Sequence, residues 1–273
     1  METIRKSSIA GSWYPGKSST LKLDIEKYFD AVPHLDWAGE ITGLIAPHAG
    51  YIYSGQVAAH AYKLIRGKKY DAIVIVGPSH RLAFHGVSIF RKGGYETPLG
   101  VVPIAEELAE DIKKFSGIVD DIPGAHLQEH SLEIQLPFLQ VALGDISFVP
   151  LVMGDQRSET CYDLTEAICR AAHGKKILIV GSSDLSHFHN YKTASQLDAV
   201  VLKHLQNGDA QGLLKSLNSE ICEACGGGPM VVAMLVAQRM GAVKSRLLKY
   251  ANSGDVTGDE SSVVGYASAV YYK

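Results

Sequence analysis

Three short apolar runs in this chain each lead into a turn that contains a histidine. The runs are 41–46, 72–76 and 177–180, and the turns after them contain His48, His80 and His187. Short runs rich in Ile and Val, bounded by Gly, Pro or Ser, are typical of buried parallel strands. In an open α/β sheet, ligands bind beyond the carboxyl ends of such strands. We therefore expect the three histidines to meet in one cleft, although they lie far apart in the sequence.

Histidine binds metals and transfers protons near neutral pH, so this cleft indicates metal or acid–base chemistry. Taken singly, His48 and His80 could each be a loop histidine with an ordinary hydrogen bond. Two such turns at the ends of consecutive strands favour a functional site over two unrelated loops.

The rest of the chain alternates expected strands with expected helices. Helices are expected at 18–31, 54–66, 104–115, 131–143, 158–172, 194–206, 210–217 and 229–240, and strands at 41–46, 72–76, 146–152, 177–180, 245–252 and 263–272, with a β-leaning stretch at 86–102. Pro137 must kink one of these helices or mark its first turn. Repeated alternation predicts an α/β fold with three layers, α/β/α, around a mostly parallel sheet. Because no Pro- or Ser-rich linker interrupts the chain, we expect one domain over residues 1–273.

The composition argues against several classes of protein. A net charge of −3 argues against a nucleic-acid surface. No apolar run in the sequence is long enough to cross a bilayer. Residues 1–8 lack the apolar stretch of a secretory signal, so we expect a cytoplasmic protein.

A carboxylate and an imidazole lie three residues apart at Asp184 and His187. In a helical turn this spacing puts both on one face, where the carboxylate can orient the imidazole. Alternatively, Ser183 or Asp184 caps a helix. His189 lies two residues further on, where we expect a surface or rim position.

A dense polar run precedes the helix expected at 131–143, and it contains Glu129, His130 and Glu133. Ser131 with the nearby carboxylates fits a capping box. The other interpretation places His130 or Glu133 in the lining of the cleft.

The four cysteines fall into two pairs. Cys161 and Cys169 lie in one expected helix, and we expect both in the core. Cys222 and Cys225 form a C-x-x-C, which in a reducing compartment indicates metal or redox chemistry more than a disulfide. Cys225 precedes three glycines and a helix whose dipole would lower the pKa of the thiol, making it a ligand or a nucleophile. A buried cysteine in a glycine turn is the alternative.

Five segments in combination resemble the motifs of the Memo-like family. They are AGSWYP (10–15), APHAGY (46–51), GPSH (77–80), EHSLE (129–133) and SDLSH (183–187). The family is similar in fold to the class III extradiol dioxygenases, which hold Fe(II) with two histidines and a carboxylate. The resemblance implies that His48 and His80 are metal ligands and that Cys225 takes the place of the carboxylate. His187 then stands where the dioxygenases keep their acid–base histidine.

The resemblance also bears on the roles of further residues. Asp184 joins His187 as a catalytic candidate, and Trp13 joins His130 as a residue of the substrate pocket. In prokaryotes the family is associated with radical-SAM and AMMECR-type proteins, which implies a shared pathway.

Three functions are compatible with these residues. The first is a metal-dependent oxidoreductase that acts on an unknown small molecule with iron, copper or zinc; a thiolate ligand favours copper or zinc without excluding iron. The second is a non-catalytic module whose cleft binds a peptide or a small acidic ligand, with the helix start after 226–228 as the anion site. The third, a hydrolase built on Ser183, His187 and Asp184, ranks last because the sequence has no G-x-S-x-G elbow.

Overall fold

The protein has an α/β fold built on one large mixed sheet. The computed structural model describes residues 4–34 and 37–273, so the first three residues of the segment examined for a secretory signal lie outside it. Within these residues, eight strands of the sheet follow the order β10-β12-β2-β9-β3-β8-β4-β7, and a ninth strand, β11, pairs with β12. The strands are β2 (Ile41–Ala46), β3 (Ala72–Pro78), β4 (Val87–Ile89), β7 (Val119–Asp120), β8 (Phe148–Met153), β9 (Ile177–Ser182), β10 (His187–His189), β11 (Lys244–Asn252) and β12 (Val263–Tyr272).

The centre of the sheet is parallel and its flanks are mixed. β2, β9, β3 and β8 run parallel to one another, and every residue in these four strands is buried. Because both faces of these strands are buried, their sequences are almost continuously apolar. β12 is antiparallel to β2, and β4 is antiparallel to β8.

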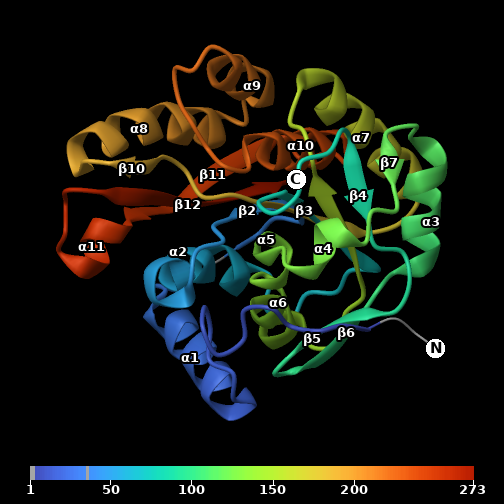
Figure 1. The fold of residues 1–273 in the computed structure, drawn as a ribbon, viewed down its shortest axis with the longest axis horizontal. Coiled ribbons are helices and arrows are strands. Elements are labelled where there is room, and N and C mark those ends of the chain that lie inside the picture. Colours follow the sequence, from blue (N-terminus) through green and yellow to red (C-terminus); the bar gives the residue numbers. More distant parts are fainter. Residues whose placement is uncertain (1–3, 35–36) are drawn as a thin grey trace.

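Helices cover both faces of the sheet, which gives the three expected layers (Figure 1). One face carries α1 (Ser18–Ala31), α2 (Tyr51–Leu64), α5 (His130–Glu133) and α6 (Leu136–Leu143); the other carries α3 (Glu106–Phe115), α7 (Ser158–Ala171), α8 (Tyr191–Asn207), α9 (Ala210–Asn218) and α10 (Gly227–Arg239). Two short helices, α4 (Gly124–Leu127) and α11 (Ser253–Thr257), lie outside these groups, and β1 (Ile4–Arg5), β5 (Gly94–Thr97) and β6 (Gly100–Pro103) form a small separate sheet.

Gly181 allows α10 to pack closely against the sheet. A Cβ at this position would lie 2.9 Å from Cβ of Ala233 and 2.9 Å from the carbonyl oxygen of Pro229. Only glycine accepts so close an approach. The contact brings the start of α10, and Cys225 just before it, to the end of β9.

Two expectations about helices were wrong. The single helix expected at 131–143 is two helices, and Pro137 lies in the first turn of the second. Ser131 does not cap the first of them; its backbone N–H donates to the carboxylate of Glu129, which occupies the N-cap. Among the described residues, no helix combines the length and the apolar character needed to cross a bilayer.

Candidate metal centre

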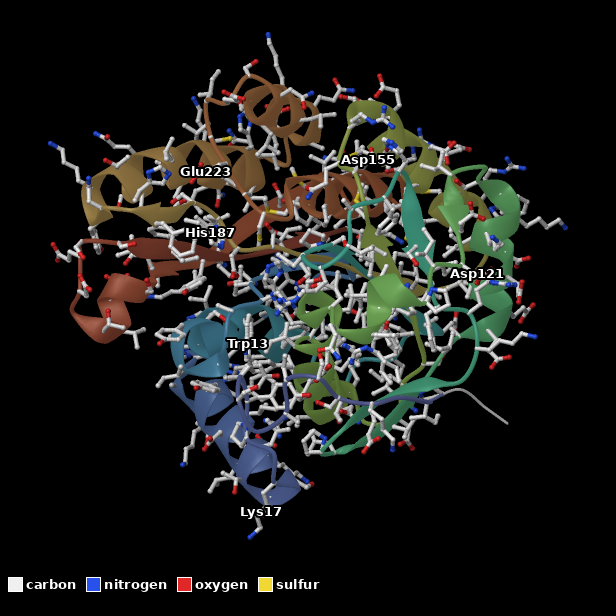
Figure 2. All side chains as sticks on the ribbon, viewed as in Figure 1. Trp13, Lys17, Asp121, Asp155, His187 and Glu223 are labelled. Carbon is white, nitrogen blue, oxygen red and sulfur yellow. The ribbon has the colours of Figure 1, made fainter. Side chains whose placement is uncertain are left out.

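A cleft of about 500 Å³ opens at the carboxyl ends of the central strands. Its lining contains His48, His80, His130, Asp184 and His187 together with Ser12, Trp13, Ala49, Gly50, Ile52, Tyr53, Val264 and Tyr266. Figure 2 labels two of these residues, His187 on β10 and Trp13 near α2. The three turn histidines therefore lie in one cleft.

Three potential metal ligands converge at the base of this cleft. One ligand atom from each of His48, His80 and Cys225 lies within 4.8 Å of the other two. Sγ of Cys225 is 3.0 Å from Nε2 of His48, and the rings of His48 and His80 are nearly perpendicular with centroids 5.1 Å apart. Two imidazole nitrogens and one sulfur form a donor set that transition metals accept.

A hydrogen-bond network fixes the tautomer of His48. The hydroxyl of Ser182 donates to the carbonyl of Ser131 at 2.6 Å and accepts from Nε2 of Gln135 at 2.8 Å. Its single proton is thus committed, so Nδ1 of His48, 3.0 Å away, must be the donor to Ser182. Nε2 of His48 then carries the lone pair, and it faces Cys225.

Glu129 fixes His80 in a similar way. Its carboxylate lies 2.9 Å from Nδ1 of His80 and also accepts from the backbone N–H groups of His80 and Ser131. Burial opposes ionisation of Glu129, but the hydrogen bonds from His80 outweigh it and lower its pKa to about 2. An ionised carboxylate behind a histidine orients the ring and increases the basicity of the other nitrogen.

Burial also keeps two histidines of the cleft neutral. It lowers the pKa of His48 to about 3, with a further contribution from His80. It lowers the pKa of His130 to about 3, with a further contribution from His48. A neutral imidazole is the form that binds a metal.

His130 and Trp13 form one wall of the cleft. The ring of His130 stacks on that of His80, with the ring centroids 4.4 Å apart. It also packs against the indole of Trp13, with the centroids 4.3 Å apart. Nδ1 of His130 has no hydrogen-bond partner among the described residues, although it is buried. Glu133, the other residue considered for the lining, is fully buried in an ion pair with Arg5 outside the cleft.

The segment that carries Asp184 and His187 is extended, not helical as expected. Leu185 donates its N–H to the carbonyl of Gly265, and Gly265 donates to the carbonyl of Ser186. The backbone is therefore held by β12, and neither Ser183 nor Asp184 caps a helix there. Tertiary pairing has overridden the local preference.

Asp184 positions the His48 loop instead of orienting His187. Its Oδ1 accepts from the backbone N–H groups of His48 at 2.7 Å and Ala49 at 3.3 Å. Burial raises its pKa to about 6. Nδ1 of His187 lies 2.8 Å from the carbonyl of Leu185 and must donate to it, so in the neutral imidazole the lone pair is on Nε2.

Cys225 does not have the lowered pKa expected at a helix start. Burial raises the pKa of its thiol, and the charge of Asp184 raises it further. Desolvation of the thiolate therefore outweighs the helix dipole. A backbone N–H, that of Asp184, points at the sulfur at 3.3 Å.

The glycines after Cys225 do not leave N–H groups free for an anion. The N–H of Gly226 donates to Ser183, that of Gly227 to Ala224, and that of Gly228 to Gln156. The expected anion site is thus already filled by the chain itself. Of the other cysteines, Cys161 and Cys222 are buried and Cys169 is partly buried.

The sequence did not identify the residues that orient the ligands. In the sequence Glu129 is only one member of a polar run, and Ser182 lies in the turn after the strand expected at 177–180. His80 and Glu129 are 49 residues apart, and His48 and Ser182 are 134 apart. No local pattern links residues at such separations.

Comparison with known proteins agrees with the motifs. A model of the Memo-like protein family matches residues 5–270. This chain belongs to the Memo-like family. A MEMO1 family protein of Methanobrevibacter smithii is 37% identical over 283 residues, covering 98% of this chain and 99% of the relative. Those of Methanothermobacter thermautotrophicus and Aeropyrum pernix are each 38% identical, covering 97% and 96% of this chain and 99% and 98% of the relative.

Proposed function

We propose that this Memo-like protein binds a divalent transition metal and uses it in redox chemistry on a small molecule. The observation that carries the proposal is the convergence of His48, His80 and Cys225, with ligand atoms within 4.8 Å of one another. The noncoordinating nitrogens of both histidines already have partners, so the ligand nitrogens are fixed in advance.

The donor set favours some metals over others. A thiolate with two imidazoles suits copper or zinc and also accepts iron. Zinc has no redox chemistry of its own, so the redox proposal favours copper or iron. Because the thiol of Cys225 is protonated in the metal-free protein, metal binding must release its proton, and metal affinity should increase with pH.

The chain's own residues have distinct roles in this proposal. The metal supplies a redox-active Lewis acid when bound. His187 accepts or donates a proton at Nε2, since its Nδ1–H is committed to Leu185. Trp13 and His130 hold the substrate against the metal side of the cleft, and Asp184 holds the loop that presents His48.

The two other functions have less support. A module that binds acidic ligands at 226–228 lacks the free N–H groups that the anion would need. In a hydrolase, the base would contact the nucleophile, but the hydroxyl of Ser183 donates to the carbonyl of Asp184 at 2.6 Å.

Metal analysis of purified variants tests the proposal. We expect wild-type protein to bind about one transition-metal ion per chain, and His48→Ala and His80→Ala to lose it, because a missing ligand cannot be replaced by the residues behind it. His204→Ala is a matched control, since His204 also contacts an Asp and a Ser but lies outside the cleft. Retention of wild-type metal content in both cleft variants would refute the proposed site.

A second measurement addresses catalysis separately from binding. We expect negligible ring cleavage of simple catechols, because Cys225 replaces a carboxylate ligand and changes the charge and softness of the site. His187→Ala should keep the metal and lose any oxygen consumption that the loaded protein supports. Robust catechol cleavage by the unmodified protein would instead make it a working dioxygenase.

A further inference from the structure

A second cavity lies beside the segment that connects α9 to α10 and carries Cys225. Its volume is about 650 Å³, within the range of sites for small molecules. α9 packs against both α8 and α10 in this part of the fold (Figure 1). The cavity is lined by Gln156, His189, Leu197, Leu214, Leu217, Asn218, Glu220, Cys222, Glu223, Ala224, Gly227 and Gly228. None of these residues lines the cleft of the candidate metal centre, so the two cavities are distinct.

The two cavities are neighbours. On β10, His187 lines the cleft and His189 lines the second cavity. Sγ of Cys225 faces His48 in the candidate metal centre, whereas Cys222 lines the second cavity. The two cysteines of the C-x-x-C therefore belong to different sites, and the proposed metal chemistry leaves the second cavity without a role.

One part of the lining of the second cavity is apolar. Leu197 comes from α8, and Leu214 and Leu217 come from α9; we call these three residues the leucine wall. Leu214 is buried, and the other two are half-buried. A hydrocarbon chain that covers the leucine wall removes apolar surface from water, which favours binding.

The polar part of the lining carries negative charge. It includes the carboxylates of Glu220 and Glu223 and, among the described residues, no Lys or Arg. Leu217 and Asn218 at the end of α9 also border the cavity, and the carbonyl end of a helix carries partial negative charge. Lys215 on the same helix is exposed and lies outside the lining. The second cavity thus combines an apolar surface with groups that attract a cation.

Glu223 has one carboxylate oxygen left for a ligand. Its Oε1 accepts from the backbone N–H of His187 at 3.1 Å and lies 2.7 Å from Nε2 of His189. Both of these contacts use Oε1, which leaves Oε2 to accept from a ligand. The side chain is 47% exposed, so a ligand can reach it. Figure 2 labels Glu223 close to His187.

An anion would find no donors at the start of α10, which also borders the second cavity. The N–H of Gly227 donates to the carbonyl of Ala224, and that of Gly228 donates to Oε1 of Gln156 at 2.7 Å. Because these N–H groups are used within the chain, the helix start has none to offer a ligand. A carboxylate or phosphate would also be repelled by the two glutamates of the lining.

We propose that the second cavity binds a free primary alkylamine in its protonated form, with the ammonium at Glu220 and Glu223 and the alkyl chain along the leucine wall. An ammonium is a donor only, and Oε2 of Glu223 is an acceptor without a second task. This inference goes beyond the proposed metal centre and requires no metal, so either proposal can fail without the other.

Monodansylcadaverine, a fluorescent dye with a primary ammonium on a five-carbon chain, tests the inference in metal-free protein. We expect saturable binding of about one dye per chain. Hexylamine should displace the dye at a concentration at least about tenfold lower than hexanoate, because the glutamates attract the ammonium and repel the carboxylate. Equal or better displacement by hexanoate would overturn the proposal.

A second competitor distinguishes a free amine from a lysine side chain. Nα-acetyl-lysinamide carries the same ammonium on a peptide unit, and it should displace the dye less well than hexylamine, because its amides would lose water against the leucine wall. Equal or better displacement by this compound would overturn the free amine in favour of a lysine side chain.

Charge variants test the role of the two carboxylates. Glu220→Gln and Glu223→Gln combined in one protein should weaken dye binding about tenfold, the loss expected when two exposed charge contacts are removed. Glu107→Gln combined with Asp111→Asn is the matched control, because it removes the same charge from α3, outside the second cavity. Binding that is unchanged in the first double variant would overturn the proposal.

Apolar variants locate the bound dye. Leu217→Ser should weaken binding about fivefold through the lost contact with the alkyl chain. Leu23→Ser is the matched control, because Leu23 is 55% exposed on α1 and lies outside the second cavity. Tyr53→Ser, which changes the lining of the cleft, should leave dye binding unchanged. A larger loss in Tyr53→Ser than in Leu217→Ser would place the dye in the cleft and overturn the proposal.

Discussion

Glu129 and Glu133 are four residues apart, and both are buried with a lowered pKa, yet they belong to clusters of opposite kinds. Around Glu133, the carboxylate accepts from Arg5, Tyr14 and the backbone and side chain of Ser8. The guanidinium of Arg5 in turn donates to the carbonyls of His126 and Glu129. This cluster is closed: its strong donors and acceptors satisfy one another.

The cluster around Glu129 is open. Glu129 satisfies one nitrogen of His80, and Ser182 satisfies one nitrogen of His48. The other nitrogen of His48 faces Sγ of Cys225, and both rings line the cleft. Nδ1 of His130 has no hydrogen-bond partner among the described residues and lies 3.6 Å from the carboxylate of Glu129. The comparison teaches that burial and charge do not separate a structural polar cluster from a candidate functional one, whereas the convergence of potential ligand atoms does.

The largest effect should come from breaking the closed cluster. Glu133→Ala leaves the charge of Arg5 buried without its partner, which should cost about 3–5 kcal/mol of the free energy of unfolding. Urea unfolding of the metal-free protein measures it. A loss below about 1 kcal/mol, the range of exposed ion pairs, would show that the cluster is not closed.

The matching change in the open cluster should affect metal binding instead. Glu129→Gln removes the charge and places an NH2 group against an N–H donor, so metal affinity should fall about 10–100-fold. The loss of unfolding free energy should be smaller than for Glu133→Ala, because no buried cation is left without its partner. Competition with a chelator measures the affinity. Equal losses of stability in Glu129→Gln and Glu133→Gln would remove the distinction between the two clusters.

The pH dependence of the unfolding free energy should distinguish the two clusters, because each has a buried histidine in it or beside it. Burial lowers the pKa of His48 in the open cluster and of His126 beside the closed one, each to about 3. The unfolded chain binds more protons between pH 6.5 and 3, so stability is full above pH 6.5 and falls with pH by up to about 1.4 kcal/mol per unit for each histidine. Bound metal should steepen this loss in wild type, because binding releases the proton of Cys225 and metal affinity therefore falls with pH. His126→Gln should reduce the slope by about one proton with or without metal. Urea unfolding between pH 7 and 5 gives these slopes, and an identical slope with and without metal would contradict Cys225 as a ligand that loses its proton.

The smallest effect concerns Cys225. Because burial raises its pKa, iodoacetamide should modify it slowly in the metal-free protein at neutral pH and faster as pH rises, in proportion to the thiolate. Metal should slow the reaction further. Mass spectrometry of peptides, with Cys225→Ser as the control, follows this residue alone; rapid alkylation at neutral pH would restore the expectation of a helix-activated thiol.

The strand ends were predictable because the signal is local. β2 and β3 appear in the sequence as apolar runs followed by histidine turns, and α7 and α10 as helical patterns. The residues that act across the sheet were not predictable. Glu129 orients a histidine on another loop, the conformation of 183–186 depends on pairing with β12, and the pKa of Cys225 depends on how deeply α10 packs. Each of these properties exists only after distant segments meet.

The place of β12 in the sheet sets an order of assembly. β12 lies between β2 and β10, so β10 and its His187 join the sheet through residues 263–272. His48, His80 and Cys225 are all synthesised before that strand. On the ribosome, a growing chain can therefore bring the three candidate ligands together before β12 can fix His187. Under the proposed function, the last strand to emerge is the one that adds the proton-transfer residue to the metal site.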